Sequence, residues 1–389
     1  MTGSHPALEG GPIFLDYNAT TPVDPRVAEA TLPYLTHHFG NPSSGHAYAE
    51  QPRRALAEAR GRLADMIGAQ PEELAFTAGG SEADALALRG VPLTDGPGAH
   101  IITQVTEHPA VLETCSALQR LHGIEVTYLP VDGDGLVDPR ALADAFTQRT
   151  ALVSIMTANN ETGVLQPIAE LARLTHEHGA IFHTDAAQAA GKIPLDVRAL
   201  GVDLLTIAGH KMYAPKGIGA LYVRSGLRLE PLIHGGGQER GLRAGTENIA
   251  LAVALGAAAH IAEDELVAGA ADRIRALRDL LHGRLDTLLP GLVQLNGHPD
   301  QRLPNTLNIS ITGVTADDLL SATPAVAAAT GLACHTGSPE PSPVLLAMGH
   351  DPGRGLSALR LTLGRWTARD EVERAAEQLA ANARHLLAA

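Results

Sequence analysis

The amino-acid sequence predicts an α/β protein with one large, mostly parallel sheet followed by a smaller α+β domain. Short apolar runs alternate with helical patterns between about residues 74 and 223, which is typical of a parallel sheet covered on both faces by helices. After about residue 260 longer amphipathic patterns replace this alternation. Seven strands are expected in the large sheet: Leu74–Thr77, His100–Val105, Ile124–Leu129, Ala151–Met156, Ala180–Thr184, Asp203–Ile207 and Ile218–Val223.

Length, composition and charge narrow the class of protein. The chain has 389 residues, of which 45% are hydrophobic and 19% charged, as in a globular protein of two domains. Its net charge of -14 argues against nucleic acid or an anionic membrane as a partner. No signal peptide and no apolar run of about 18 residues is visible, so a cytoplasmic location is expected. Two cysteines do not make a disulfide framework or a four-cysteine zinc site.

In the first part of the chain, the segment of about residues 1–22 contains a short apolar stretch closed by a turn. A helix is expected from Pro52 to Gly68, where the glycine is a typical helix terminator, and another from Ile168 to His178. We expect a large domain over residues 13–260 and a small one over residues 261–389, joined by the N-terminal segment.

The elements expected in the small domain begin with a long amphipathic helix that contains Ile274 and Leu288. The last helix is expected to start at Thr367, with Asp370 completing a capping box. Three strands are expected between them: Leu292–Leu295, Thr306–Ile311 and Leu359–Leu363.

The most informative stretch is the strand Asp203–Ile207, which is soon followed by Gly209, His210 and Lys211. Pro215 and two glycines come next, so no helix is expected there. Lys211 should therefore lie at the carboxyl edge of the sheet, where open α/β folds bind ligands. Most lysines are simply solvated, but a desolvated lysine has a lowered pKa and can form an imine with a carbonyl compound.

Polar residues also follow four other strands. Gly80 and Ser81 lie in a turn before a helix, whose N-terminus could bind phosphate, and Asp185, His108 and Asn160 follow three further strands. Each has an ordinary explanation alone: a tight connection, a helix N-cap, a loop histidine or a turn. Together with the lysine they supply what pyridoxal 5'-phosphate requires, namely a phosphate cradle, a carboxylate for the pyridine nitrogen and an imine-forming amine.

From about Phe14 to Leu379 the chain resembles the cysteine desulfurases, pyridoxal-phosphate enzymes of the class V aminotransferase group. The resemblance implies a fold-type I homodimer that serves sulfur metabolism, including iron–sulfur cluster assembly. It is carried by motifs in the family's order: Leu15–Pro22, Phe39–Ser44, Glu107-His108, Asn159–Glu161, His183–Gln188, Gly209–Lys211, Arg243–Thr246 and Leu359–Arg365.

The resemblance also implies a role for each candidate residue around the cofactor ring. It makes Lys211 the Schiff-base lysine and Asp185 the partner of the pyridine nitrogen. His108 would stack on the ring and help to move protons. Gln188 and Asn160 would contact the ring oxygen and the substrate.

Further residues would hold the two charged ends of the cofactor–substrate pair. The phosphate would be bound by Gly80, Ser81 and His210, with Thr246 reaching over from the partner subunit. Arg360 would hold the substrate carboxylate, a task suited to the planar, two-pronged guanidinium group.

Cys334 matches the position of the family's nucleophile, ahead of a Gly/Pro/Ser-rich stretch. A thiolate there could attack the sulfur of a bound L-cysteine, giving L-alanine and a persulfide that is passed to an acceptor protein. The other cysteine, Cys115, lies in a helical pattern and is expected to be a small buried hydrophobic residue.

Three departures from the family pattern leave an alternative open. Ala208 stands where serine is common, so one phosphate hydrogen bond is missing or replaced, and Asp84 follows a phosphate turn where Ser/Asn-type residues are common. Cys334-His335 replaces the usual Cys-Thr. The residues around Cys334 are similar to those of selenocysteine lyases, so L-selenocysteine is the alternative substrate.

A metal-dependent hydrolase is an alternative from another class. His183, Asp185 and His210 have side chains suited to zinc. This interpretation leaves Lys211 and the phosphate turn without a role, so no metal site is expected.

Overall fold

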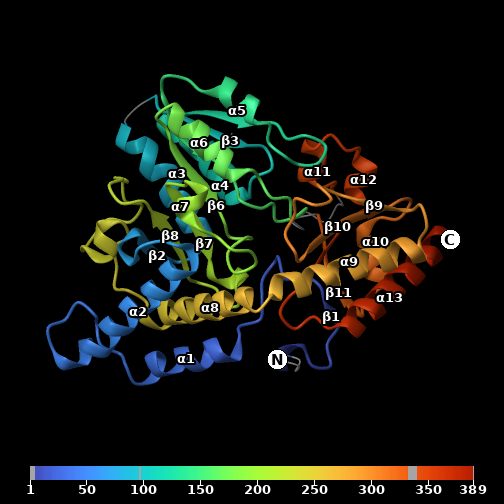
Figure 1. The fold of residues 1–389 in the computed structure, drawn as a ribbon, viewed down its shortest axis with the longest axis horizontal. Coiled ribbons are helices and arrows are strands. Elements are labelled where there is room, and N and C mark those ends of the chain that lie inside the picture. The colour runs from blue at the N-terminus through green and yellow to red at the C-terminus, as the bar shows by residue number, and fades with distance from the viewer. Residues whose placement is uncertain (1–4, 96–97, 332–339, 389) are drawn as a thin grey trace.

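The computed structural model describes residues 5–95, 98–331 and 340–388. The structure contains one seven-stranded sheet. Figure 1 shows this sheet with its helices on one side of the molecule, and a second sheet with the helices α9 (Ala270–Leu288) and α13 (Arg369–Ala388) on the other. Among the described residues, no helix is both long and apolar enough to cross a membrane. The cytoplasmic location expected from the sequence stays a prediction.

The large sheet has the strand order β2-β8-β7-β6-β5-β3-β4. All neighbouring pairs are parallel except those of β8, which runs antiparallel to β2 and β7. This confirms the predicted α/β class and all seven strands, with boundaries that agree with the prediction to within two residues. The strands are β2 (Leu74–Thr77), β3 (His100–Gln104), β4 (Glu125–Leu129), β5 (Thr150–Ser154), β6 (Ile181–Asp185), β7 (Leu204–Ala208) and β8 (Gly219–Val223).

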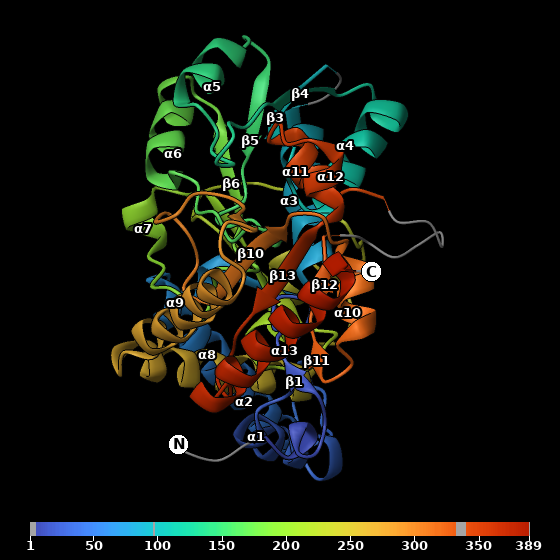
Figure 2. The same ribbon diagram turned by 90° about the vertical axis from the view of Figure 1, so that its right-hand side faces the viewer.

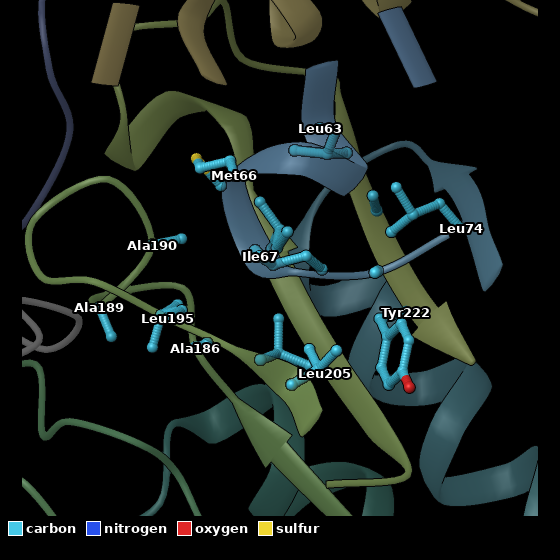
Figure 3. Packing of buried hydrophobic residues seen from close by; sticks show 14 of the residues in the cluster. Leu63, Met66, Ile67, Leu74, Ala186, Ala189, Ala190, Leu195, Leu205 and Tyr222 are labelled. Atoms are coloured by element: carbon cyan, nitrogen blue, oxygen red, sulfur yellow. The ribbon is translucent and has the colours of Figure 1, made fainter. Parts of the chain in front are cut away.

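Helices cover both faces of this sheet, and each face has its own apolar core. On one face, Leu63 and Ile67 of α2 pack near Leu205 and Tyr222 of the sheet (Figure 3). α2 ends where expected, at Gly68, whose φ of 68° suits glycine. The helices are α1 (Pro25–Thr36), α2 (Glu50–Ile67), α3 (Gly80–Asp95), α4 (Pro109–His122), α5 (Pro139–Ala145), α6 (Ile168–Glu177), α7 (Val197–Leu200) and α8 (Ile249–Val267).

The second sheet is antiparallel, with the order β12-β13-β10-β9, and has a separate apolar core with α9 and α13 (Figure 2). The three predicted strands of this region are confirmed. The elements are α9 (Ala270–Leu288), β9 (Val293–Leu295), β10 (Thr306–Ile311), α10 (Ala316–Ala322), β11 (Val326–Ala327), β12 (Ala329–Thr330), α11 (Pro343–Ala347), α12 (Pro352–Leu356), β13 (Ala358–Thr362) and α13 (Arg369–Ala388).

The N-terminal segment links the two large parts of the fold. β1 (Ile13–Phe14) pairs in parallel with β11 in a two-stranded sheet. The carbonyl of Leu15 accepts from the N–H of Thr362 in β13, and the N–H of Thr21 donates to the carbonyl of His210, just beyond β7. The predicted domain boundary near residue 260 stays a prediction.

The predicted capping box of the last helix is wrong in detail. The Thr367 hydroxyl accepts from the N–H of Gly364, and the carboxylate of Glu371, rather than Asp370, accepts from the N–H of Ala368. The helix therefore begins two residues later than expected, at Arg369.

Candidate active site

The candidate residues are carried to one edge of the large sheet by the elements that end there. Asp185 is the last residue of β6, and Lys211 closes the short 3₁₀ turn that follows β7. His108 is the N-cap of α4, and Gly80 opens α3. Since β5, β6 and β7 are parallel neighbours, the residues that follow them converge on the carboxyl edge.

A cavity of about 390 Å³ lies at this edge, here named the sheet-edge cavity. Thr246 does not line it and is exposed. Cys334 lies outside the described residues. The cavity is lined by the other nine predicted site residues: Gly80, Ser81, His108, Asn160, Asp185, Gln188, His210, Lys211 and Arg360.

The amine of Lys211 is held by main-chain carbonyl groups. Its Nζ donates to the carbonyl oxygens of Asn18 at 2.6 Å and Ala19 at 2.9 Å. Burial, reinforced by the positive charge of Arg360, lowers its pKa to about 8, against the opposing attraction of two carboxylates. A larger share of this amine than of an ordinary lysine is therefore unprotonated and nucleophilic near neutral pH.

Asp185, which is buried, and His108, which is half-buried, line the same cavity. Asp185 is 6% exposed and accepts from the N–H of Ala187 at 2.8 Å. Burial raises its pKa, while the Ala187 N–H and the charges of His108 and Lys211 oppose that rise. Burial lowers the pKa of His108, whose Nδ1 accepts from the N–H of Ala110. Asp185 is thus a buried carboxylate that a protonated ring nitrogen would stabilise.

The N-terminus of α3 forms the phosphate-like end of the cavity. The first N–H groups of a helix have no partner within the helix and attract anions. At Gly80 an added Cβ would lie 3.2 Å from the Cβ of Ala208, so glycine lets the helix start close to β7. Burial lowers the pKa of His210 to about 4, and its Nδ1 is bonded to the hydroxyl of Thr20. The groups available to bind an anion at this end of the cavity are therefore mainly uncharged N–H donors.

The second sheet supplies the opposite wall through Arg360 of β13. Its Nη2 donates to Asp16 Oδ1 at 2.8 Å and its Nη1 to the carbonyl of Asn160 at 3.3 Å. Its buried Nε has no hydrogen-bond partner among the described residues. The guanidinium group thus retains a donor for a ligand.

Two polar residues that line the cavity, Asn18 and Asp84, were not among those predicted. The side chain of Asn18 bonds Lys192, Asn305 and Thr306, the last of which is the first residue of β10. Asp84 is buried, and its Oδ1 has no hydrogen-bond partner in the described chain. Asn18 lies in the motif Leu15–Pro22, and Asp84 closely follows the predicted phosphate turn. Nothing in the sequence around either residue indicates by itself that its side chain lines the cavity.

The arrangement speaks against the metal-site alternative. The imidazole of His183 is fully buried and bonded to the hydroxyls of Ser154 and Thr206. Residues 5–95, 98–331 and 340–388 contain no group of three or more His, Cys, Asp or Glu side chains that could hold a metal ion. Cys115 is buried as expected, and burial raises the pKa of its thiol to about 12.

The residues present fit pyridoxal phosphate. The sheet-edge cavity combines a helix N-terminus, a nucleophilic amine and a buried carboxylate. The orphaned Nε of Arg360 and Oδ1 of Asp84 show that the polar groups of this cavity are not satisfied by the protein alone.

Comparisons with known proteins identify the family. The model of the class-V aminotransferases matches residues 13–375. A mitochondrial cysteine desulfurase of Drosophila melanogaster is 46% identical over 95% of this chain and 80% of its own. Cysteine desulfurase IscS of Rickettsia bellii is 44% identical over 93% of this chain and 88% of its own.

Solved structures agree. A NifS-like protein is 35% identical, with a TM-score of 0.88 over 95% of this chain and 98% of its own. SspA in complex with cysteine is 35% identical, with a TM-score of 0.80 over 91% of this chain and 99% of its own. This chain belongs to the class-V aminotransferase family, within its cysteine desulfurase group, and pyridoxal phosphate is its cofactor.

Proposed function

We propose that this protein is a cysteine desulfurase, which converts L-cysteine to L-alanine and transfers the sulfur to Cys334 as a persulfide for delivery to an acceptor protein. The observation that carries the proposal is the convergence of Lys211, Asp185 and Arg360 on one cavity. Pyridoxal phosphate, when bound, acts as an electron sink for bonds at the substrate Cα.

The residues at the sheet edge hold the cofactor and move protons. Lys211 would bind the cofactor's aldehyde carbon through Nζ and then move a proton at the substrate Cα, tasks suited to an amine whose pKa is about 8. Asp185 would keep the ring nitrogen protonated. His108 would cover the ring, and Gln188 would donate to the ring oxygen. The N–H groups of the α3 N-terminus would hold the phosphate.

Arg360 and Asn160 orient the substrate. The substrate carboxylate would take the free Nε of Arg360 and compete with Asp16 for Nη2, so both prongs of the guanidinium could serve one ligand. Asn160 lies beside it, since its carbonyl accepts from Nη1.

Cys334 receives the sulfur. Its thiolate Sγ forms a bond to the substrate sulfur while the substrate C–S bond breaks, which leaves a persulfide on Cys334. The carbon skeleton keeps the electron pair of the broken bond, gains a proton and leaves as alanine.

We propose that the protein is a homodimer. Leu35 of α1, Phe39 and Tyr48 are 69%, 78% and 69% exposed, and the two rings lie 5.4 Å apart. Exposed apolar side chains, and above all such a pair of aromatic rings, are typical of a protein interface. A second copy would cover it and bring Thr246 to the phosphate. Phe39→Ser should shift the sedimentation equilibrium towards monomer.

The deciding experiment measures alanine release from L-cysteine and from L-selenocysteine, compared by kcat/KM. Comparable or faster turnover of cysteine supports the desulfurase, whereas alanine from selenocysteine alone would make the protein a selenocysteine lyase. Lys211→Ala should abolish the visible absorbance band and turnover, while Lys216→Ala, at an exposed lysine, should change neither. Cys334→Ala should keep the band but form no persulfide; full-rate persulfide formation would remove Cys334 from the mechanism.

A further inference from the structure

Lys192 is a half-buried lysine for which the proposed reaction has no use. Only three of the 29 basic residues are lysines, and Lys192 and Lys211 both lie near the sheet-edge cavity. The Nζ of Lys192 donates to Gln188 Oε1 at 2.8 Å and to Asn18 Oδ1 at 3.0 Å. Among the described residues it has no ion pair with a carboxylate. Such a placement is costly for an ammonium group and calls for an explanation.

The surrounding carbonyl groups fix the orientation of both amides. Gln188 Nε2 lies 3.0 Å from the main-chain carbonyl of Asn18, which can only accept, so Oε1 must face Lys192. The Asn18 Nδ2 lies 3.2 Å from the carbonyl of Asn160, so its Oδ1 likewise faces Lys192. Lys192 therefore donates to both amide oxygens.

A neutral amine suits this position. It has two N–H groups for the two acceptors, whereas an ammonium group would have a third N–H without a partner in the described structure. Burial, with the positive charges of Lys211 and Arg360, lowers the pKa of Lys192 well below its usual range. Since a guanidinium group cannot lose its charge, arginine would not replace lysine here.

The hydrogen bond from Lys192 affects Gln188, which lines the sheet-edge cavity. One N–H of its Nε2 is used by the carbonyl of Asn18, and its Oε1 is used by Lys192. The second N–H of Nε2 remains for the cavity. Without Lys192 the Oε1 would lack this donor, and the carbonyl of Asn18 alone would hold the amide in its present orientation.

We propose that Lys192 is a positioning residue that locks the amide of Gln188, so that an N–H donor rather than a carbonyl faces the ring oxygen of the cofactor. The inference rests on the proposed placement of pyridoxal phosphate but not on the choice between cysteine and selenocysteine.

The test uses the holoenzyme and needs no substrate. Lys192→Met, which keeps the length of the stem but removes the donors, is compared with Lys216→Met at an exposed site. The visible absorbance of the bound cofactor is titrated with pH. Loss of a donor makes the ring oxygen a stronger base, so the midpoint should rise by about half a unit or more in Lys192→Met and stay unchanged in Lys216→Met.

A double-mutant cycle separates positioning from general damage. Gln188→Leu is combined with Lys192→Met, and the double variant should shift the midpoint no further than Gln188→Leu alone. Additive shifts, or a wild-type titration in folded Lys192→Met, would overturn the proposal. If Lys192→Met does not fold, Lys192→Gln takes its place in the cycle, with the same expected non-additivity. A wild-type protein without any bound-cofactor band would instead refute the proposed function.

Discussion

Two cavities of similar size, both in contact with Lys192 or with its partner Gln188, differ in how far their polar groups are satisfied. The sheet-edge cavity has a volume of about 390 Å³. The second, here named the Trp366 cavity, has a volume of about 340 Å³ and is lined in part by Tyr213, Glu265, Arg365 and Trp366. Lys192 contributes its side chain to the lining of the second, while its amine bonds Gln188 beside the first.

The difference lies in how far the polar groups are satisfied. In the Trp366 cavity, Arg365 pairs with Asp24 and Glu265, and its guanidinium lies 3.9 Å from the ring centroid of Tyr213. In the sheet-edge cavity, Asp84 Oδ1 and Arg360 Nε are buried without hydrogen-bond partners in the described chain. Volume therefore does not distinguish a ligand site from a packing gap here, whereas unused hydrogen-bonding capacity does.

The largest expected effect comes from neutralising an acid of the sheet-edge cavity. Asp185→Asn keeps the size of the side chain but cannot stabilise a protonated ring nitrogen. Turnover of L-cysteine should fall about 10²- to 10⁴-fold while the protein stays folded. Steady-state alanine release and circular dichroism measure the two properties.

The matched control is Glu265→Gln in the Trp366 cavity, whose side chain is 27% exposed. Its turnover should stay within about threefold of wild type, since surface-accessible ion pairs contribute little. An equal loss of turnover in both variants would show that the two cavities do not differ as described.

The second prediction concerns stability. Arg365 is 7% exposed and contacts two carboxylates, so Arg365→Ala leaves buried negative charge less compensated. The free energy of unfolding should fall by about 3–5 kcal/mol, measured by urea denaturation. The visible spectrum of the remaining folded holoenzyme should not change. A changed spectrum with unaltered stability would assign the Trp366 cavity a chemical role.

The elements that form the sheet-edge cavity could be predicted from the sequence, whereas the contacts between distant residues could not. The seven strands and the residues at their ends were predictable, because apolar runs and turn residues are local signals and parallel strands share one carboxyl edge. Nine candidate residues accordingly line one cavity. Their chemical roles stay proposals.

What could not be predicted depends on long-range partners. Asn18 bonds residues as distant as Asn305 and Thr306, and Arg360 meets Asp16 from the other end of the chain. No local pattern encodes such contacts. The prediction of the α13 cap was wrong for a reason of shorter range, because the Thr367 hydroxyl accepts from the N–H of Gly364. Competition among nearby N–H groups decides such details.

The third prediction concerns Glu161, a buried acid that lines neither cavity. Unlike Asp84 Oδ1, its Oε2 has a hydrogen-bond partner, because it accepts from the Ser342 hydroxyl at 2.6 Å. Burial raises its pKa from 4.5 to about 7, against that hydrogen bond and the charge of Arg360. Between these two pH values the folded protein binds a proton that the unfolded chain does not. The contribution of Glu161 to stability is therefore full below about pH 4.5 and is lost as pH rises through 7.

Glu161→Gln should abolish this dependence. It should be close to wild type at about pH 5 and more stable by up to about 3 kcal/mol at about pH 8, by denaturant unfolding at both values. Glu170→Gln, at an exposed residue of α6, should show no such difference. A variant destabilised at pH 8 would mean that the folded protein needs the charged carboxylate.

The smallest effect is expected at Asp84, and it sharpens the contrast within the sheet-edge cavity. Burial, with the nearby charges of Asp185 and Glu107, raises its pKa well above the usual range. Burial therefore favours the uncharged form of this group, and Asp84→Asn is close to isosteric with that form. Turnover should change less than about threefold and stability by about 1 kcal/mol or less. If Asp84→Asn instead lowered turnover as far as Asp185→Asn, both carboxylates would carry charge, and the cavity would depend on an acid pair rather than on Asp185 alone.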